Sequence, residues 1–166
     1  MSNEDDRGSL PYFGYGTLLG EGHMRASYPS AEVIGTGIYD GYELAFHRYG
    51  AQGEGGCTIV ARPGAQLHGV LYRLNDADMD RLMEVGGAAR HYEARPIEVR
   101  LPSGATTRAV TLRVDGDEGP WVPPEAYGRL VTDGAAEAGL PADYQARLGS
   151  IVDEARGHVA ERPTGP

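Results

Sequence analysis

The fold of this chain is decided by the stretch Tyr12-Phe13-Gly14-Tyr15-Gly16-Thr17-Leu18-Leu19. Its aromatic residues favour an extended strand, and the glycines favour a tight turn directly after it. Gly14 and Gly16 leave the backbone uncovered on either side of Tyr15, so a ligand can approach the main-chain N–H groups there. On this stretch alone two interpretations are open: an ordinary first strand with its turn, or a strand that leads into a ligand-binding loop.

The composition narrows the classes of function. The chain has 166 residues, which suits one domain, and its 25 glycines and 11 prolines predict short elements with many turns. A formal net charge of −9 repels phosphate backbones and anionic lipids, so nucleic acid and membrane surfaces are not expected partners. All 15 basic residues are arginine. The lack of lysine excludes a Schiff-base mechanism and indicates a GC-rich, bacterial coding sequence.

Cysteine usage and targeting signals indicate the cellular setting. The single cysteine, Cys57, excludes an internal disulfide framework and a zinc site built from several cysteines. No apolar run reaches the roughly 18 residues of a membrane span, and the N-terminus lacks the features of a secretory signal. We therefore expect a cytoplasmic protein with a disordered leader over residues 1–9, one domain over 10–158 and a frayed tail over 159–166.

The pattern of apolar residues predicts strands first and the longer helices last. Strands are expected over 12–15, over 31–46 (one bent strand or two), over 57–61, over 67–74, and as a hairpin over 92–101 and 106–114. The turn Arg62-Pro63-Gly64-Ala65 separates the strands at 57–61 and 67–74. Helices are expected over 18–25, 76–85, 125–137 and 142–158. This order favours an α+β fold over a doubly wound sheet.

Further segments complete a pattern that begins with the opening stretch. A central strand reads Gly69-Val70-Leu71-Tyr72-Arg73-Leu74, and a short helix and then Tyr92 follow it. The last segment is Gly134-Ala135-Ala136-Glu137-Ala138-Gly139-Leu140-Pro141, with Tyr144 after it. In this order the segments resemble the γ-glutamylcyclotransferase family, also called AIG2-like. The resemblance implies a small mixed β-barrel flanked by helices.

The resemblance also implies an activity and a site. The family's reaction is intramolecular: the α-amine of a γ-glutamyl amine or amino acid attacks its own γ-carbonyl and releases 5-oxoproline. A small-molecule γ-glutamyl substrate is therefore expected, with no metal and no cofactor, while the leaving amine and the oligomeric state stay open. The substrate-binding residues that the resemblance implies are Tyr12, Phe13, Gly14, Tyr15, Gly16, Thr17, Leu18, Tyr92 and Tyr127.

The reaction also needs a base that deprotonates the substrate's α-ammonium. The family supplies a glutamate from the helix after the central strand, and that position falls on Gly86 here. Glu84, two residues earlier, is the nearest carboxylate and the predicted catalytic residue. On a regular helix two residues amount to a rotation of about 200°, so Glu84 reaches the site only where the helix unwinds or shifts. Otherwise Glu84 is a solvated residue at a helix end.

Gly86 leaves two alternatives to an ordinary cyclotransferase. The chain is then a divergent member that performs other chemistry in a biosynthetic pathway, or it binds a small ligand in the same pocket without turnover. Other candidates carry weaker patterns. Cys57 is expected in the core and His23 at the surface or in a structural role, while Tyr127 either contacts the ligand or packs on the barrel.

Overall fold

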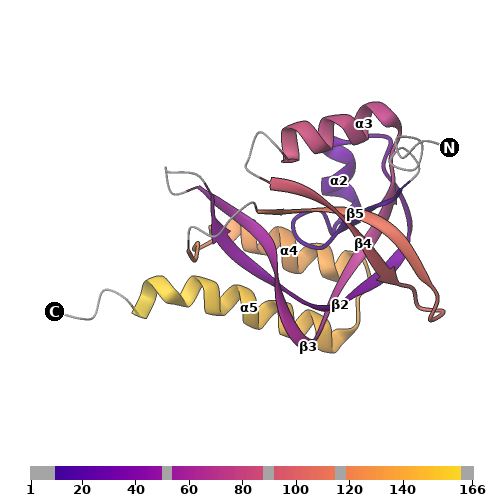
Figure 1. Cartoon of the computed structure of the whole chain (residues 1–166). Helices are drawn as coiled ribbons and strands as arrows, with labels where there is room; N and C mark the ends of the chain where they lie inside the picture. The colour runs from indigo at the N-terminus through magenta and orange to yellow at the C-terminus, as the bar shows by residue number, and fades with distance from the viewer. Residues whose placement is uncertain (1–9, 50–53, 88–91, 115–118, 162–166) are drawn as a thin grey trace.

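The computed structural model describes residues 10–49, 54–87, 92–114 and 119–161. The expected leader over 1–9 and residues 162–166 of the expected tail lie outside these ranges. Within them the strands close into one barrel, and the helices pack around it (Figure 1). The prediction of an α+β fold built on a small mixed barrel with flanking helices is confirmed.

The barrel is built from β1 (Tyr12–Gly14), β2 (Glu32–Arg48), β3 (Gly55–Arg73), β4 (Tyr92–Arg100) and β5 (Thr106–Val114). Their spatial order is β1-β3-β2-β4-β5, and β4 with β5 forms the predicted hairpin. Neighbouring strands are antiparallel except β1 and β5, which run parallel where Tyr12 pairs with Val110. This contact closes the sheet on itself, which removes the exposed edges of an open sheet.

The long hairpin of β2 and β3 contains most of the sheet. β2 is a single strand, bent where the pairing shifts between Val33 and Gly35 and between Asp40 and Tyr42. The prediction of two strands over 57–61 and 67–74 is wrong, because β3 runs through both. Residues 62–65 bulge out opposite Gly41 instead of ending the strand, since β2 pairs with β3 on both sides of the bulge.

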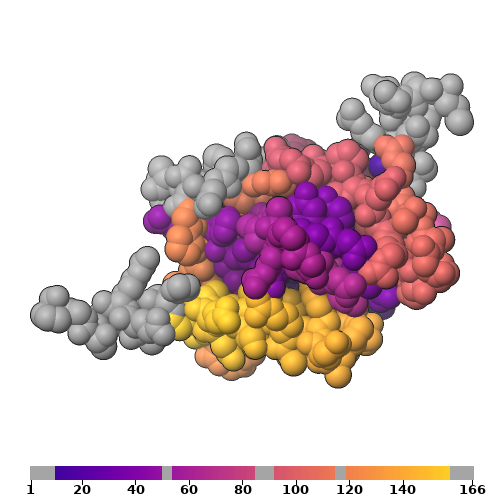
Figure 2. All heavy atoms as spheres, turned by 60° about the horizontal axis from the view of Figure 1, so that its bottom comes forward, coloured from indigo at the N-terminus to yellow at the C-terminus, as the bar shows by residue number. Residues whose placement is uncertain are grey.

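The helices form two pairs. Figure 1 shows α2 (Glu21–Ser27) and α3 (Asp76–Arg81) together at the top of the view, and α4 (Glu125–Glu137) and α5 (Ala142–Glu161) together in its lower half, where β2 and β3 cross them. α3 continues as a π-helix, η1 (Leu82–Gly87), so the helix predicted over 76–85 is regular only in its first part. Figure 2 shows α4 and α5 along one flank, with outer faces of β2 and β3 uncovered beside them. None of the described helices is both long and apolar enough to span a membrane.

α4 fixes the position of the loop that follows β1. A carbon at the Cβ position of Gly134 would lie 2.7 Å from the backbone nitrogen of Gly20, so a larger residue would prevent this close approach. Three residues further along α4, the Glu137 carboxylate accepts a hydrogen bond of 3.2 Å from the backbone N–H of Gly22. The C-terminal motif of the sequence therefore holds the opening stretch and the first turn of α2 in place.

Candidate functional site

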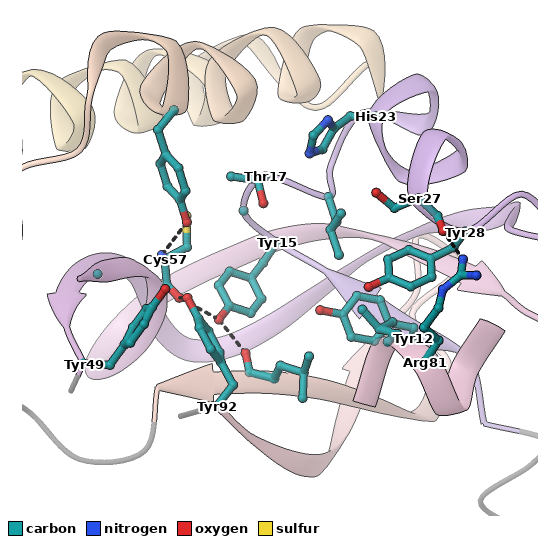
Figure 3. A pocket seen from close by; sticks show the side chains of 16 residues that line it. Tyr12, Tyr15, Thr17, His23, Ser27, Tyr28, Tyr49, Cys57, Arg81 and Tyr92 are labelled. Atoms are coloured by element: carbon teal, nitrogen blue, oxygen red, sulfur yellow. Dashed lines mark hydrogen bonds between the residues drawn. The ribbon is translucent and has the colours of Figure 1, made fainter. Parts of the chain in front are cut away.

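A cavity of about 520 Å³ lies beside the loop that follows β1. This volume is typical of sites for small molecules. Its lining has two contrasting parts (Figure 3). We call Tyr15, Cys57, Tyr92 and Tyr127 the phenol end, and we call His23, Ser27, Tyr28 and Arg81 the charged end. The loop residues Gly16, Thr17 and Leu18 also line the cavity.

The side chains of the phenol end are held by backbone groups. The hydroxyl of Tyr92 donates to the carbonyl oxygen of Cys57 at 2.6 Å, and the hydroxyl of Tyr127 accepts from the N–H of Cys57 at 2.9 Å. The hydroxyl of Tyr15 donates to the carbonyl oxygen of Leu112 at 2.5 Å. Buried polar groups normally have such partners. Tyrosines from the opening stretch, β4 and α4 therefore share one fixed arrangement.

Burial keeps the phenol end neutral. It raises the pKa values of Tyr15, Tyr92 and Tyr127 well above the ordinary phenol value, and it raises the pKa of the Cys57 thiol to about 12. Hydrogen bonds from Tyr127 and from the backbone of Thr17 lower the pKa of this thiol but do not offset burial. Near pH 7 the phenol end therefore offers hydrogen bonds and apolar surface, but no charge.

The charged end is built around Arg81, the last residue of α3. Its guanidinium donates to the carbonyl oxygen of Ser27 and forms an ion pair with Asp78, with 3.3 Å between Nη2 and Oδ1. The guanidinium carbon lies 5.1 Å from the centre of the Tyr28 ring, within the range of a cation–π contact. His23 projects from α2 beside Thr17 (Figure 3). Unlike the phenol end, this end has two exposed ionisable side chains, His23 and Arg81.

Most of the residues predicted for the site line the cavity: Tyr12, Tyr15, Gly16, Thr17, Leu18, Tyr92 and Tyr127. Phe13 lies outside the lining because successive residues of a strand point to opposite sides, and its side chain is fully buried in the core. Gly14 also lies outside it, with its Cβ position directed at the carbonyl oxygen of Leu18.

Glu84 lies on η1, and its side chain is exposed. It is not among the described residues that line the cavity. The irregular helix that would redirect this residue is present, but it does not bring the carboxylate into the lining. The catalytic role of Glu84 stays a prediction.

The pattern of residues does not indicate His23, Ser27 or Arg81 as cavity residues, although all three line the cavity. They come from α2 and α3, and the turn after α2 is joined to α3 where the carboxylate of Asp78 accepts a hydrogen bond of 2.9 Å from the backbone N–H of Ser30. One signal was available, since Asp78 and Arg81 are three residues apart, a spacing that places opposite charges on one face of a helix. Cys57 is buried as expected, but it also forms part of the cavity wall.

No carboxylate is found among the cavity-lining residues in the described ranges. Histidine is the side chain that ordinarily exchanges a proton near neutral pH, and His23 is the histidine of this described lining. Across the described parts of the chain, no three His, Cys, Asp or Glu side chains are grouped closely enough to hold a metal ion.

Comparison with known proteins relates this site to a family. A sequence model of the family described as Gamma-glutamyl cyclotransferase, AIG2-like, matches residues 12–129. Two proteins named Gamma-glutamylcyclotransferase, from Bos taurus and Homo sapiens, are each 28% identical to this chain over 164 and 167 residues. Each alignment covers 94% of this chain and 86% of the relative.

A solved structure named Gamma-glutamyl cyclotransferase has a TM-score of 0.77 and 26% identity, covering 86% of this chain and 87% of that one. The family match contains the opening stretch, the whole barrel and the beginning of α4. The resemblance stated from the sequence is therefore confirmed. This chain belongs to the γ-glutamyl cyclotransferase, AIG2-like family.

Proposed function

We propose that this enzyme releases 5-oxoproline from a γ-glutamyl amine or γ-glutamyl amino acid by intramolecular aminolysis. One observation carries the proposal: the loop after β1, which lies within the family match, forms a wall of the cavity of about 520 Å³. The phenol end adds a buried wall with fixed hydrogen-bonding groups, which suits a small polar acyl group. Family membership supports the reaction type, and a panel of substrates identifies the leaving amine.

The reaction takes place within one substrate molecule. The α-amine attacks the γ-carbonyl carbon, a C–N bond forms to close the lactam ring, and the C–N bond to the leaving amine breaks. The α-nitrogen loses two protons, one before the attack and one as the ring closes, and both end on the leaving nitrogen, which departs as an ammonium group, so no water or second reactant is consumed. Holding the substrate in its folded conformer supplies much of the rate, because the attack then needs no encounter between molecules.

The opening stretch can stabilise the charge that develops on the γ-carbonyl oxygen. Gly16, Thr17 and Leu18 line the cavity, and the backbone of Thr17 lies close enough to the thiol of Cys57 to lower its pKa. Because a thiol is a weak acceptor, a more basic oxygen of a bound substrate would compete well for a main-chain N–H group of this loop. Loss of one donor to such an oxyanion typically costs about 2.7–4 kcal/mol of transition-state stabilisation.

Two residues are candidates for the base. Glu84 carries the prediction from the sequence, and η1 supplies the departure from a regular helix that this prediction requires. His23 lines the cavity, and a neutral imidazole can take a proton from the α-ammonium. Glu84→Gln and His23→Gln are matched variants for this question. Loss of nearly all kcat in one of them identifies the base, and an unchanged kcat in the other provides the control.

The activity is tested by incubating the protein with a panel of γ-glutamyl dipeptides and γ-glutamyl amines. We expect 5-oxoproline and the free amine to appear in equal amounts, measured by chromatography. If every compound on the panel gives no product above the rate without protein, the proposal is wrong.

A second function, binding without turnover, is supported by the lack of a carboxylate in the described lining of the cavity. Under this alternative, calorimetry detects binding of 5-oxoproline while no γ-glutamyl compound is consumed. Gly86→Glu introduces a carboxylate at the position where the resemblance places the family's glutamate. A gain of 5-oxoproline release in this variant would show that the pocket binds the substrate and that the wild-type chain lacks the base.

A further inference from the structure

Arg81 stands out among the groups that line the cavity. The chain has a net charge of −9, and the described lining contains one arginine and no carboxylate. A cation in a concave site attracts anions more strongly than one on a flat surface, because the walls exclude water and focus the field. A positive group at this place in an acidic protein needs an explanation beyond the surface charge pattern.

The guanidinium of Arg81 is held from several sides. Nη2 contacts both the carbonyl oxygen of Ser27 and the Asp78 carboxylate, and the ring of Tyr28 lies beneath the guanidinium carbon. Asp78 is itself fixed by the backbone of Ser30. These contacts join α2 to α3 and fix the orientation of the guanidinium before any ligand arrives. A group that is already ordered loses less entropy when it binds.

Part of the guanidinium is left available. Nε and Nη1 make no hydrogen bond to any residue in the described ranges, and 48% of the Arg81 side chain is exposed. Arginine presents its donors as a planar fork that matches the two oxygens of a carboxylate. The hydroxyl of Ser27 and the imidazole of His23 lie at the same end of the cavity (Figure 3). The charged end therefore has free hydrogen-bond donors, and Asp78 is the one described carboxylate there that competes with a ligand for the guanidinium.

We propose that the charged end is a carboxylate subsite in which Arg81 binds a carboxylate of the substrate and so determines specificity. This inference rests on the proposed function, because a γ-glutamyl amino acid carries two carboxylates. One belongs to the α-carbon of the γ-glutamyl group and the other to the leaving amino acid. Both offer the same chemistry to a guanidinium, and the choice of substrates below separates them.

The test compares wild type and Arg81→Gln on matched substrates. γ-Glutamylalanine carries both carboxylates, γ-glutamylmethylamide lacks the one on the leaving group, and the α-amide of γ-glutamylalanine lacks the other. We expect Arg81→Gln to raise KM for γ-glutamylalanine by roughly ten- to a hundredfold, as for loss of a hydrogen bond between charged groups, with little change in kcat. Arg81→Lys, which keeps the charge but loses the fork, should give a smaller increase.

The substrate for which the KM penalty disappears identifies the carboxylate that Arg81 binds. An equal penalty on all three substrates, or no penalty on any, overturns the proposal. Arg25→Gln is the matched control, since Arg25 is an exposed α2 residue outside the cavity lining that pairs with Glu21 at 3.8 Å. Its KM values should equal those of wild type, and thermal unfolding should show that each variant is folded.

Failure of the proposed function remains distinguishable from failure of this inference. If wild type releases no 5-oxoproline from any substrate, the cyclotransferase proposal fails, and calorimetry with γ-glutamylalanine decides the subsite alone. Weaker binding by Arg81→Gln than by wild type supports the subsite in that case. Equal affinities, or no binding to wild type, overturn it.

Discussion

The two ends of the cavity offer a ligand different kinds of polar group. At the phenol end the polar atoms are buried and already bonded to backbone groups, so they fix the shape of the wall and stay neutral. At the charged end an exposed guanidinium is oriented by its neighbours but keeps free donors. The contrast teaches that different elements supply the two properties. The barrel and α4 supply the rigid neutral wall, and α2 and α3 supply the charge.

The largest expected effect comes from adding one methyl group beside the phenol end, at Gly16, and not at Gly22 in α2. In Gly16→Ala the new carbon would lie 2.8 Å from Sγ and 2.9 Å from Cβ of the buried Cys57, so the wall must shift. We expect the free energy of unfolding to fall by about 2–3 kcal/mol, as in overpacked cores, with loss of activity. Gly22→Ala in α2 meets only an ordinary contact and should be neutral or stabilising. Urea unfolding measures both, and equal losses would contradict the contrast between the ends.

A smaller effect is expected from removing single hydroxyls of the phenol end. Tyr127→Phe leaves the buried N–H of Cys57 without its acceptor, which should cost about 1–3 kcal/mol of unfolding free energy. Tyr92→Phe should cost less, because it removes a donor from the carbonyl oxygen of Cys57, and an under-satisfied carbonyl is better tolerated than a buried N–H without an acceptor. Thermal unfolding of the two variants checks this order. A larger loss for Tyr92→Phe would show that the two hydrogen bonds are not arranged as described.

At the charged end the expected effect depends on pH. The hydroxyl and the backbone N–H of Ser30, together with Arg81, lower the pKa of Asp78. A lowered pKa in the folded state means that the stabilisation is fully present above the ordinary carboxyl pKa of about 3.9 and is lost as pH falls through the folded-state pKa.

Asp78→Asn should therefore be less stable than wild type near pH 7, and the difference should shrink in acid. Urea unfolding at a series of pH values below 7 measures it. A difference that stays constant down to the lowest pH would contradict an ionised Asp78 at this end. Tyr127→Phe is the control, because the phenol end has no carboxylate in its described lining and its penalty should not change over this range.

The smallest effect is expected away from both ends. Arg129 pairs with Glu125 on the exposed face of α4, where such pairs contribute little. Arg129→Gln should change the free energy of unfolding by less than about 0.5 kcal/mol and leave kinetics unchanged. A larger effect would mean that exposed arginines of this chain stabilise it in general, which would weaken the special position of Arg81.

Local sequence patterns predict single helices and strands better than they predict whether neighbouring segments form one continuous element. The helix over 125–137 is found with the predicted bounds, because Pro124 at its start and Gly139 after its end are signals carried by the sequence itself. β3 was divided in error, because Pro63 and Gly64 look like a turn unless the uninterrupted partner strand is known. The opening stretch forms a contiguous motif, so the family resemblance implies substrate-binding residues there, and Tyr12, Tyr15 and the residues 16–18 line the cavity.

The charged end was not predicted for a physical reason. His23 and Arg81 reach one cavity only because α2 packs beside α3, and the contact between Ser30 and Asp78 that holds them is a tertiary one. No periodicity or spacing within either helix encodes that contact. Glu84 shows the opposite limit: its place in the sequence suggests a catalytic role, its side chain is exposed on η1 outside the described cavity lining, and the role stays a prediction.

The short parallel contact between β1 and β5 has a consequence for the order in which the molecule is made. Phe13 and Thr111, bonded through carbonyl and hydroxyl, are 98 residues apart, whereas β2 and β3 are neighbours in the chain. Nearby strands pair early, and distant ones wait for the intervening chain. On the ribosome β1 emerges before both of its neighbours, β3 and β5, so it is not paired on both sides until β5 has been synthesised. The cavity is thus among the last parts of the nascent protein to form, and a bound ligand would report a completed barrel.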